Sequence, residues 1–252
     1  MKSILSWNVN GIRSIVRKNA LKPVIDQLDP DVICLQEIKV HEEVSVHLDK
    51  YPYKYWNFGE RRGYAGVAVF SKIQPSSIKL GIGHRSDSEG RVIALTFDDF
   101  ILVNVYVMNS GSELERLTNR KSFDDALRKY IKDLSLPVVV MGDFNVAPLS
   151  KNQTDRGHDY FGNSRSHSAG LTNQERTSFT KLLKTGLVDT FRALYPDVSK
   201  WTYWNFRAKS RKNGWRIDFA LVSEDLYDRV RDSTIHDDLY GSDHCPIVLH
   251  LK

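Results

Sequence analysis

The sequence has few cysteines and lacks the arrangements in which cysteine usually builds a structural site. Its two cysteines, Cys34 and Cys245, each lie in an apolar run. The chain contains no CxxC pair and no Cys/His spacing typical of a zinc site. We therefore expect two buried free thiols instead of a disulfide, and a reducing intracellular environment such as the cytoplasm.

Long hydrophobic runs are missing as well. No apolar stretch is long enough to cross a membrane, and the N-terminus runs into a strand-like segment without the apolar region of a signal peptide. The sequence also has no linker, repeat or low-complexity tract that would divide it, so residues 1–252 are interpreted as a single domain. These absences predict a cytoplasmic protein without membrane contact, and we expect it to act as a monomer.

A strong charge imbalance is absent too. The 252 residues include 36 Lys or Arg and 31 Asp or Glu, which gives a formal net charge of +5. A mildly basic chain suits a protein that approaches a polyanion, although many other proteins share this balance. The hydrophobic content of 41% is enough for a full core in a chain of this length.

Short apolar runs bounded by turn residues recur along the chain, with helical patterns between them. The runs predict strands at Ser3–Trp7, Asp31–Gln36, Gly66–Phe70, Arg91–Phe97, Ile101–Val107, Val138–Met141, Ile217–Val222 and Ile247–Leu251. Apolar spacing predicts helices at Leu21–Leu28 and Phe123–Leu134, and a capping-box sequence at Thr172–Glu175 predicts a third that extends to Leu187. This alternation predicts a layered α/β fold with a mixed sheet system, but periodicity does not give the number of sheets.

Five polar clusters stand at the ends of these apolar strands. They are Trp7–Gly11, Leu35–Glu37, Met141–Asn145, Gly214–Asp218 and Gly241–His244. Each cluster alone is more simply explained as a turn or a solvated strand end. Together they supply the residue types that one hydrolytic reaction on a phosphodiester requires.

One part of this set suits a hard divalent cation. Glu37 and Asp243, with Asn10 or Asn8 close by, offer the carboxylate and amide oxygens that Mg²⁺ prefers. Mg²⁺ usually keeps several water ligands, so two carboxylates are enough for an open site. The sequence therefore predicts a magnesium site at these strand ends.

The other part suits the activation of water. Asp143 and Asn145 lie two positions apart at one strand end, so they point the same way and can hold the attacking water. His244 can donate a hydrogen bond to phosphate oxygens, and Asp218 can fix the orientation of its ring. These four residues are the predicted catalytic groups.

At these residues the chain resembles the exonuclease III / AP endonuclease family, within the endonuclease–exonuclease–phosphatase superfamily that includes DNase I. The motifs stand in family order over nearly the whole chain, at Ser6–Gly11, Leu35–Lys39, Gly63–Val67, Glu89–Ile93, Tyr106–Asn109, Gly142–Asn145, Gly214–Asp218 and Gly241–Ile247. The resemblance implies a DNase I-like α/β fold, a four-layer sandwich in which two mixed β-sheets pack face to face with flanking helices. It also implies a Mg²⁺-dependent enzyme of base-excision repair, with Mn²⁺ as a substitute metal, that cuts double-stranded DNA 5′ to abasic sites and leaves a 3′-hydroxyl. A 3′→5′ exonuclease or 3′-phosphodiesterase activity would accompany this cut.

The resemblance also assigns roles to residues. It makes Glu37 the chief metal ligand, assisted by Asn10, Asp243 and Asn8. It implies that Asp143, with Asn145 beside it, aligns or deprotonates the attacking water. His244, oriented by Asp218, would contact the scissile phosphate, and Tyr106 and Asn109 would stabilise the developing charge. The last two residues enter through the resemblance alone.

DNA contacts are implied in the same way. A small apolar pocket that excludes normal nucleotides would receive the base-less sugar, formed by Tyr203, Trp204, Trp215 and Ile217. DNA phosphates would meet Arg13, Lys39, Arg62, Tyr64 and Arg116. The alternatives are core packing for the aromatic residues, which we accept for Trp201, and solvated surface for the charged ones.

The chain departs from the family pattern at three places. Met108 replaces a usual proline, Ser112 replaces a frequent basic residue, and Ser150–Ala169 does not match the segment typical of relatives. We expect the last departure to affect lesion preference and the balance of endonuclease against exonuclease activity. Two alternatives remain: a superfamily nuclease that acts mainly as a 3′→5′ exonuclease or on undamaged DNA or RNA, and a DNA-binding module without catalysis, which the complete set of polar clusters disfavours.

Overall fold

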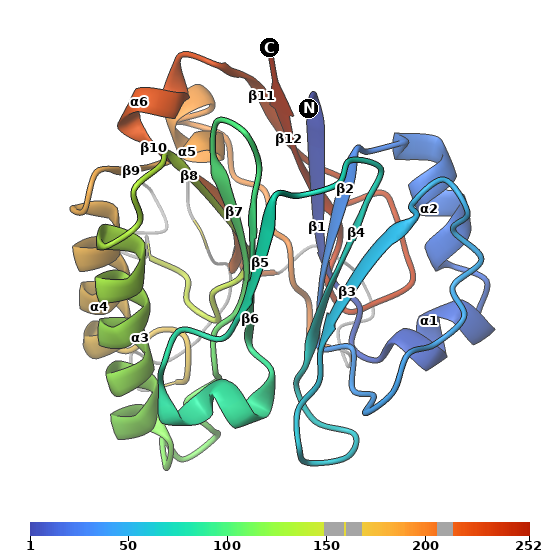
Figure 1. The fold of residues 1–252 in the computed structure, drawn as a ribbon. Coiled ribbons are helices and arrows are strands. Elements are labelled where there is room, and N and C mark those ends of the chain that lie inside the picture. The colour runs from blue at the N-terminus through green and yellow to red at the C-terminus, as the bar shows by residue number, and fades with distance from the viewer. Residues whose placement is uncertain (149–158, 160–167, 206–213) are drawn as a thin grey trace.

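Two six-stranded β-sheets pack face to face and carry helices on their outer faces (Figure 1). The computed structural model describes residues 1–148, 159, 168–205 and 214–252. The first sheet consists of β1 (Ser3–Asn8), β2 (Val32–Gln36), β3 (Tyr53–Asn57), β4 (Val67–Ser71), β11 (Val230–Ile235) and β12 (Ile247–Leu251). The second consists of β5 (Ser77–Leu80), β6 (Val92–Thr96), β7 (Ile101–Tyr106), β8 (Val138–Asp143), β9 (Leu187–Asp189) and β10 (Asp218–Ser223).

Both sheets are mixed. Their strand orders are β11-β12-β1-β2-β4-β3 and β5-β6-β7-β8-β10-β9. The pairs β1–β2 and β7–β8 are parallel, and the neighbouring pairs are antiparallel. The predicted four-layer α/β sandwich is therefore confirmed.

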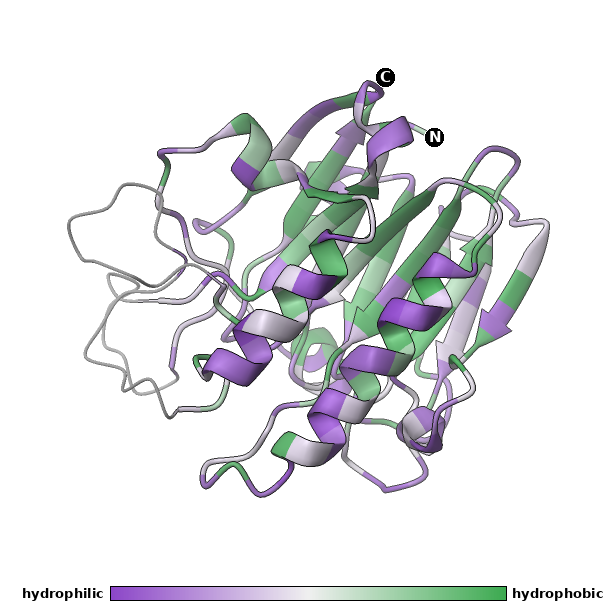
Figure 2. Ribbon diagram, turned by 90° about the vertical axis from the view of Figure 1, so that its left-hand side faces the viewer, coloured by the Kyte–Doolittle hydropathy of each residue, from purple (hydrophilic) through white to green (hydrophobic). Residues whose placement is uncertain are grey.

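In the described residues, helices lie on the two outer faces and at one end of the sandwich. They are α1 (Ile12–Arg17), α2 (Leu21–Leu28), α3 (Leu117–Lys132), α4 (Asn173–Leu183), α5 (Thr190–Leu194) and α6 (Glu224–Tyr227), with a 3₁₀ turn η1 at Arg85–Glu89. Helices α1 and α2 lie on the first sheet, α3 and α4 lie side by side on the second, and the short α5 and α6 lie at one end of the sandwich (Figure 1). Figure 2 shows α3 and α4 with hydrophilic residues outward and hydrophobic strands behind them. Within the described ranges, no helix combines the length and apolar character needed to span a bilayer.

The predicted strands were all found, within one or two residues at their ends. The four strands that the patterns did not predict are β3, β5, β9 and β11, which are the four edges of the two sheets. An edge strand is half exposed and often polar, so it lacks the continuous apolar run of a central strand. Both cysteines are buried and free, as predicted.

Two helix boundaries differ from the prediction. Helix α3 begins at Leu117 and not at Phe123. The prediction that Leu187 continues α4 was wrong, because the helix ends at Leu183 and Gly186, with φ of 91°, turns the chain into β9. The start of α4 is as expected, since Thr172 forms a reciprocal capping box.

A buried polar network joins the two sheets near one end of the sandwich. The Gln36 side chain donates to Asn104 Oδ1 (2.8 Å) and to Ser6 Oγ (2.9 Å). Asn104 in turn donates to two backbone carbonyls of the first sheet at 3.0 and 3.1 Å. Because unpaired polar groups in a core are costly, these bonds favour one alignment of the sheets. Gln36 is one residue before Glu37, and Asn104 is two residues before Tyr106.

Candidate active site

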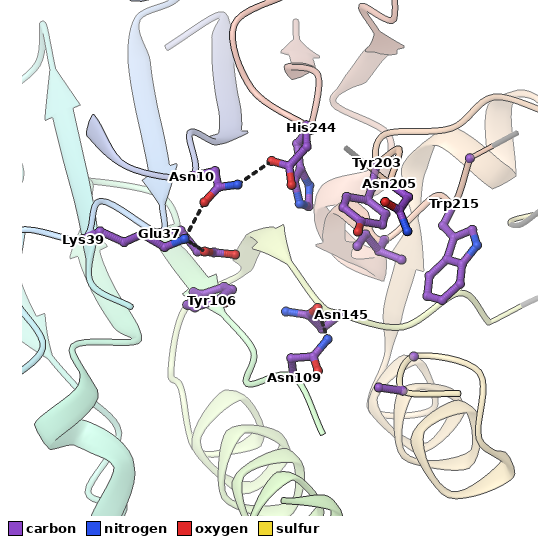
Figure 3. A pocket seen from close by; sticks show the side chains of 15 residues that line it. Asn10, Glu37, Lys39, Tyr106, Asn109, Asn145, Tyr203, Asn205, Trp215 and His244 are labelled. Carbon is purple, nitrogen blue, oxygen red and sulfur yellow. Dashed lines mark hydrogen bonds and ion pairs between the residues drawn. The ribbon is translucent and has the colours of Figure 1, made fainter. Parts of the chain in front are cut away.

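The polar clusters meet at one end of the sandwich, in a pocket of about 600 Å³ (Figure 3). Strand register aligns three of the side chains, because Asp143 in β8 is paired with Tyr106 in β7 and with Asp218 in β10. Both sheets contribute to the lining. The predicted residues that line the pocket are Asn10, Glu37, Lys39, Tyr106, Asn109, Asn145, Tyr203, Trp215, Ile217, Asp243 and His244.

Unusual backbone conformations turn several of these side chains into the pocket. Asn10, Glu37, Lys39 and Asn145 all have positive φ, between 46° and 55°. Such conformations cost roughly 1 kcal/mol or more for residues other than glycine, and the surroundings must enforce them. The backbone amide of Gly11 donates to the Glu37 carbonyl at 2.7 Å, and this bond holds the loop after β1 and the loop after β2 in these conformations.

One wall of the pocket gathers oxygen ligands. Asn8 Nδ2 donates to Glu37 Oε1 at 3.0 Å and to Asp143 Oδ2 at 2.9 Å, so this residue bridges two carboxylates. Asn10 Nδ2 donates to Asp243 Oδ1 at 3.0 Å. Burial opposes ionisation of Glu37, but nearby Lys39 and the Asn8 hydrogen bond lower its pKa.

These oxygens fit a divalent cation in their chemistry. The set combines the carboxylates of Glu37 and Asp243 with the amide oxygen of Asn10, which are the ligand types that Mg²⁺ selects. The ammonium group of Lys39 already lies against this set, 2.7 Å from Glu37 Oε2 and hydrogen-bonded to Asn10 Oδ1. A cation is therefore accommodated at this position. The side-chain oxygen of Asn8 is already used within the protein, because it accepts a hydrogen bond from the backbone amide of Asn10.

His244 lines a second wall, and its buried imidazole lies between two carboxylates that stand behind the pocket lining. His244 Nδ1 lies 2.8 Å from Asp218 Oδ2, and its Nε2 lies 3.9 Å from Asp143 Oδ2. Burial disfavours the charged ring, but Asp218, Asp143 and Asp243 together raise the pKa of His244 to about 10. Burial and Asp218 raise the pKa of Asp143 to about 7, against the opposing effect of His244. The surrounding carboxylates thus favour the protonated, cationic ring of His244, and burial beside Asp218 makes Asp143 a stronger base than an exposed aspartate.

The same three residues form a compact group of potential metal ligands. One ligand atom from each of Asp143, Asp218 and His244 lies within 4.8 Å of the others. Asp218 already occupies His244 Nδ1, and the raised pKa favours a proton on this ring. We therefore interpret the group as a proton-handling cluster, with the Glu37 wall as the better metal site.

Asn145, Asn109 and Tyr106 complete the polar lining. The Asn145 amide donates to Asp143 Oδ1 at 2.8 Å, and Asn109 Nδ2 donates to Asn145 Oδ1 at 3.1 Å. Met108, in place of the usual proline, thus leaves Asn109 in the pocket. Burial and the nearby carboxylate of Glu37 raise the pKa of Tyr106 well above its usual range, so its hydroxyl keeps a proton to donate.

The apolar wall is formed by Tyr203, Trp215 and Ile217, with Tyr203 packed 4.9 Å from the His244 ring. The predicted DNA contact of Trp204 was wrong: this residue is only 5% exposed and packs in the core between the sheets. Neighbouring residues of an extended segment point to opposite sides, so Tyr203 faces the pocket and Trp204 faces inward. Trp201 packs against the same core, as expected.

Comparison with known proteins decides the family. Residues 5–244 match the Endonuclease/Exonuclease/phosphatase family. The chain is 40% identical over 257 residues to the exodeoxyribonuclease of Bacillus subtilis (strain 168), with 98% of each chain covered. The chain belongs to this family. It is also 42% identical to the DNA repair nuclease APEX1 of Danio rerio, covering 98% of this chain and 81% of that protein.

A solved structure supports the same placement. The crystal structure of the AP endonuclease LMAP from Leishmania major has a TM-score of 0.85 to this chain at 31% identity, covering 100% of this chain and 87% of that one. The resemblance inferred from the motifs is thus confirmed, and so is the DNase I-like fold. The protein is a phosphodiester hydrolase of the exonuclease III / AP endonuclease type, from a family of metal-dependent nucleases that act on DNA.

Of the predicted phosphate contacts of this nuclease, Lys39 lines the pocket and the other four fall into two groups. Tyr64 and Arg116 belong to a cluster in which the Tyr64 hydroxyl accepts hydrogen bonds from Arg116 and from Arg91. Arg91 is 1% exposed and lies 4.7 Å from the Tyr106 ring centre, so the cluster adjoins the pocket. The second group is exposed and lies outside the pocket lining: Arg62, and Arg13, which pairs with Glu42 at 2.6 Å.

Sequence reasoning missed a buried hub formed by Arg120 and Glu175. Arg120, 2% exposed, donates to three backbone carbonyls beside Asn109 and Asn145 at 2.8, 2.8 and 3.3 Å. Glu175, fully buried, accepts from the Gly170 amide at 2.8 Å. The pair thus supports three loops that line the pocket. An arginine three positions before Phe123, on the apolar side of the helix pattern, was the signal that could have revealed it.

The divergent segment of this nuclease is attached to the apolar wall at Asp159. Of Ser150–Ala169, residues 150–158 and 160–167 lie outside the described residues. Asp159 is fully buried, and its carboxylate accepts from Arg216 Nε at 2.5 Å and from Arg192 at 2.8 Å. Its carbonyl accepts from the Arg216 amide at 2.6 Å. Asp159 thus binds both the main chain and the side chain of Arg216. Because Arg216 lies between the pocket residues Trp215 and Ile217, these bonds help to position the apolar wall.

Proposed function

We propose that this nuclease hydrolyses the backbone of double-stranded DNA 5′ to abasic sites in a Mg²⁺-dependent reaction that leaves a 3′-hydroxyl. The observation that carries the proposal is the shape of the pocket. Polar groups for phosphate chemistry form one side, and Tyr203, Trp215 and Ile217 form an apolar side a short distance away. A sugar without a base suits such a wall, since flipping costs least where pairing is already lost.

The metal would be held by Glu37, Asp243 and Asn10, with Mn²⁺ able to replace Mg²⁺. When bound, the ion supplies positive charge to the phosphate oxygens and the leaving oxygen. Asn8 keeps Glu37 and Asp143 at a fixed separation through its two hydrogen bonds, whether or not it also contacts the ion.

The protein residues would then act on water and phosphate. Asp143 accepts a proton from the attacking water, which Asn145 helps to orient. His244, held as a cation by Asp218, donates to a non-bridging phosphate oxygen, and Tyr106 with Asn109 donates to the developing charge. The new bond forms between the water oxygen and phosphorus, and the bond between phosphorus and the 3′ oxygen breaks. Its electron pair stays on the 3′ oxygen, which takes up a proton from solvent water and becomes the 3′-hydroxyl.

DNA would be positioned by cations around the pocket. Tyr64 and Arg116 adjoin the pocket through Arg91, and Lys39 lies within its lining. Arg13 and Arg62 would extend the contact along the phosphate backbone. We propose that residues 1–252 act as one catalytic domain and as a monomer.

Cleavage of a labelled duplex with one abasic-site analogue tests the proposal, with Mg²⁺ and with EDTA, beside the intact duplex. We expect a single EDTA-sensitive cut immediately 5′ to the lesion and no cut in intact DNA. A ladder from the 3′ end of both duplexes would instead establish a 3′→5′ exonuclease. The observation that favours this second function is the divergence of Ser150–Ala169 from the family pattern.

The Asp159 attachment predicts a specificity variant. We expect Asp159→Ala to lower the ratio of abasic-site cleavage to exonucleolytic digestion by roughly 10- to 100-fold, because a small displacement of Trp215 misplaces the sugar. Both rates are measured on the same end-labelled duplexes. The matched control is Asp189→Ala, which removes the other carboxylate of Arg216 (2.7 Å) and leaves Asp159 in place. An equal fall in both variants, or no fall in Asp159→Ala, would contradict the prediction.

A further inference from the structure

Lys39 is the only basic side chain in the pocket lining described here whose ammonium group contacts the proposed metal ligands. Its Nζ lies 2.7 Å from Glu37 Oε2 and is hydrogen-bonded to Asn10 Oδ1. Asn10 is joined in turn to Asp243 at 3.0 Å. Figure 3 shows the Lys39 side chain ending beside Glu37, with a dashed line that joins it to Asn10. The ammonium group thus contacts two of the three proposed metal ligands directly, and the third, Asp243, is joined to it through Asn10.

The backbone builds this placement. Glu37 and Lys39 lie two positions apart, both with positive φ, at 52° and 55°. The Lys39 amide donates to the Ala65 carbonyl at 2.9 Å, which fixes the turn. The side chain itself is 31% exposed, against 17% for Glu37. A partly exposed lysine has a flexible stem, so its head can leave while the turn stays in place.

The charges near this point explain why a cation is held there. Glu37 and Asp243 lie on the same wall, with Asp143 joined to Glu37 through Asn8. His244 supplies one compensating positive charge on the far side of Asp143. Carboxylates gathered in this way repel one another, and a nearby ammonium group reduces that repulsion.

We propose that Lys39 is a built-in competitor for the metal site: its ammonium group neutralises Glu37 in the metal-free protein and must be displaced before a divalent cation binds. The proposal rests on the metal site of the proposed function. A divalent ion carries twice the charge and can form several bonds to oxygen, so it can displace the lysine. Because the lysine competes for the same oxygens, the metal concentration needed for half-saturation is higher than it would be without Lys39. The released side chain then stands at the mouth of the pocket, where a DNA phosphate can receive it.

Direct metal binding tests this without any cleavage reaction. Mn²⁺ is titrated into DNA-free protein and the free ion is followed by electron paramagnetic resonance. We expect Lys39→Met to lower the Kd for Mn²⁺ by about three- to tenfold, the range expected for loss of one partly screened charge competitor. Lys39→Arg keeps the charge and should bind as weakly as the wild type. Lys50→Met is the matched control, because it removes a lysine paired with Asp29 at 3.1 Å, outside the pocket lining.

The outcomes separate this inference from the function on which it rests. Wild-type binding that is lost in Glu37→Ala, with an unchanged or higher Kd in Lys39→Met, would overturn the competitor role and leave the metal site intact. No Mn²⁺ binding by the wild type would overturn the metal site and the inference together. A circular dichroism spectrum of each variant in EDTA shows that the fold is kept. If Lys50→Met lowers the Kd for Mn²⁺ by the same factor as Lys39→Met, the effect comes from the net charge of the protein, and the proposal is overturned.

Discussion

Asp143→Asn is expected to lower kcat by about 10²- to 10⁴-fold, the usual contribution of a positioned general base. The amide has nearly the same shape and keeps a hydrogen-bond acceptor for the Asn145 amide, now 2.8 Å from Oδ1. It cannot take a proton from water. Single-turnover cleavage of an abasic duplex measures the loss, and fluorescence anisotropy with the same DNA should show nearly unchanged affinity.

The control for this variant is Asp29→Asn. Asp29 is an exposed carboxylate paired with Lys50 and Lys72 at 3.1 and 2.9 Å, outside the pocket lining, so its loss changes the net charge by the same amount. We expect its turnover to stay close to that of the wild type. Near-normal turnover in Asp143→Asn would show that another group activates the water.

Glu37→Ala should raise the half-saturating Mg²⁺ concentration by about 100-fold or more. Loss of a residue that only supports a ligand already costs about 10- to 100-fold in metal affinity, and Glu37 would be the chief ligand itself. The variant also removes the partner of Lys39, which leaves the ammonium group beside Asn10 alone. Cleavage rates over a range of Mg²⁺ concentrations give the shift directly.

The matched control is Glu42→Ala, because Glu42 lies in the same part of the chain and pairs with Arg13 at the surface at 2.6 Å. Its Mg²⁺ dependence should match that of the wild type. If Glu37→Ala instead lowers the maximal rate with no change in Mg²⁺ dependence, the ion is held elsewhere, and the group of Asp143, Asp218 and His244 becomes the candidate.

Much of the site was predictable because its residues stand where strands end. A central strand is an apolar run, so the polar residue that follows it is conspicuous, as at Glu37 and Asp143. The end of a strand also fixes where that residue lies, since neighbouring strands end at the same edge of a sheet. Tyr106 was different: only the resemblance indicated a role for it, because a tyrosine at a strand end is ordinary in a core.

The remainder depended on tertiary packing that local patterns do not encode. The four edge strands were missed because one side of each has no partner, and β5 is exposed at every position. The resemblance implied a place in the pocket for Trp204, because a matching motif does not say which way each residue of an irregular segment points. Arg120 and Asp159 form partners across long sequence separations, which become visible only when the loops meet.

The active pocket is divided between the two sheets, which are joined by side-chain hydrogen bonds and by main-chain bonds such as that from the Gly66 amide to the Glu89 carbonyl at 3.2 Å. Glu37 follows a strand of one sheet and Asp143 ends a strand of the other, while the His244–Asp218 pair crosses from the first to the second. Hydrogen bonds between the buried faces add a directional constraint to the packing of the apolar side chains, because their geometry allows only discrete positions. The relative position of the catalytic residues therefore depends on the buried hydrogen bonds of Gln36 and its partners between the sheets. A substitution there would lower the rate of cleavage although every residue that lines the pocket is unchanged.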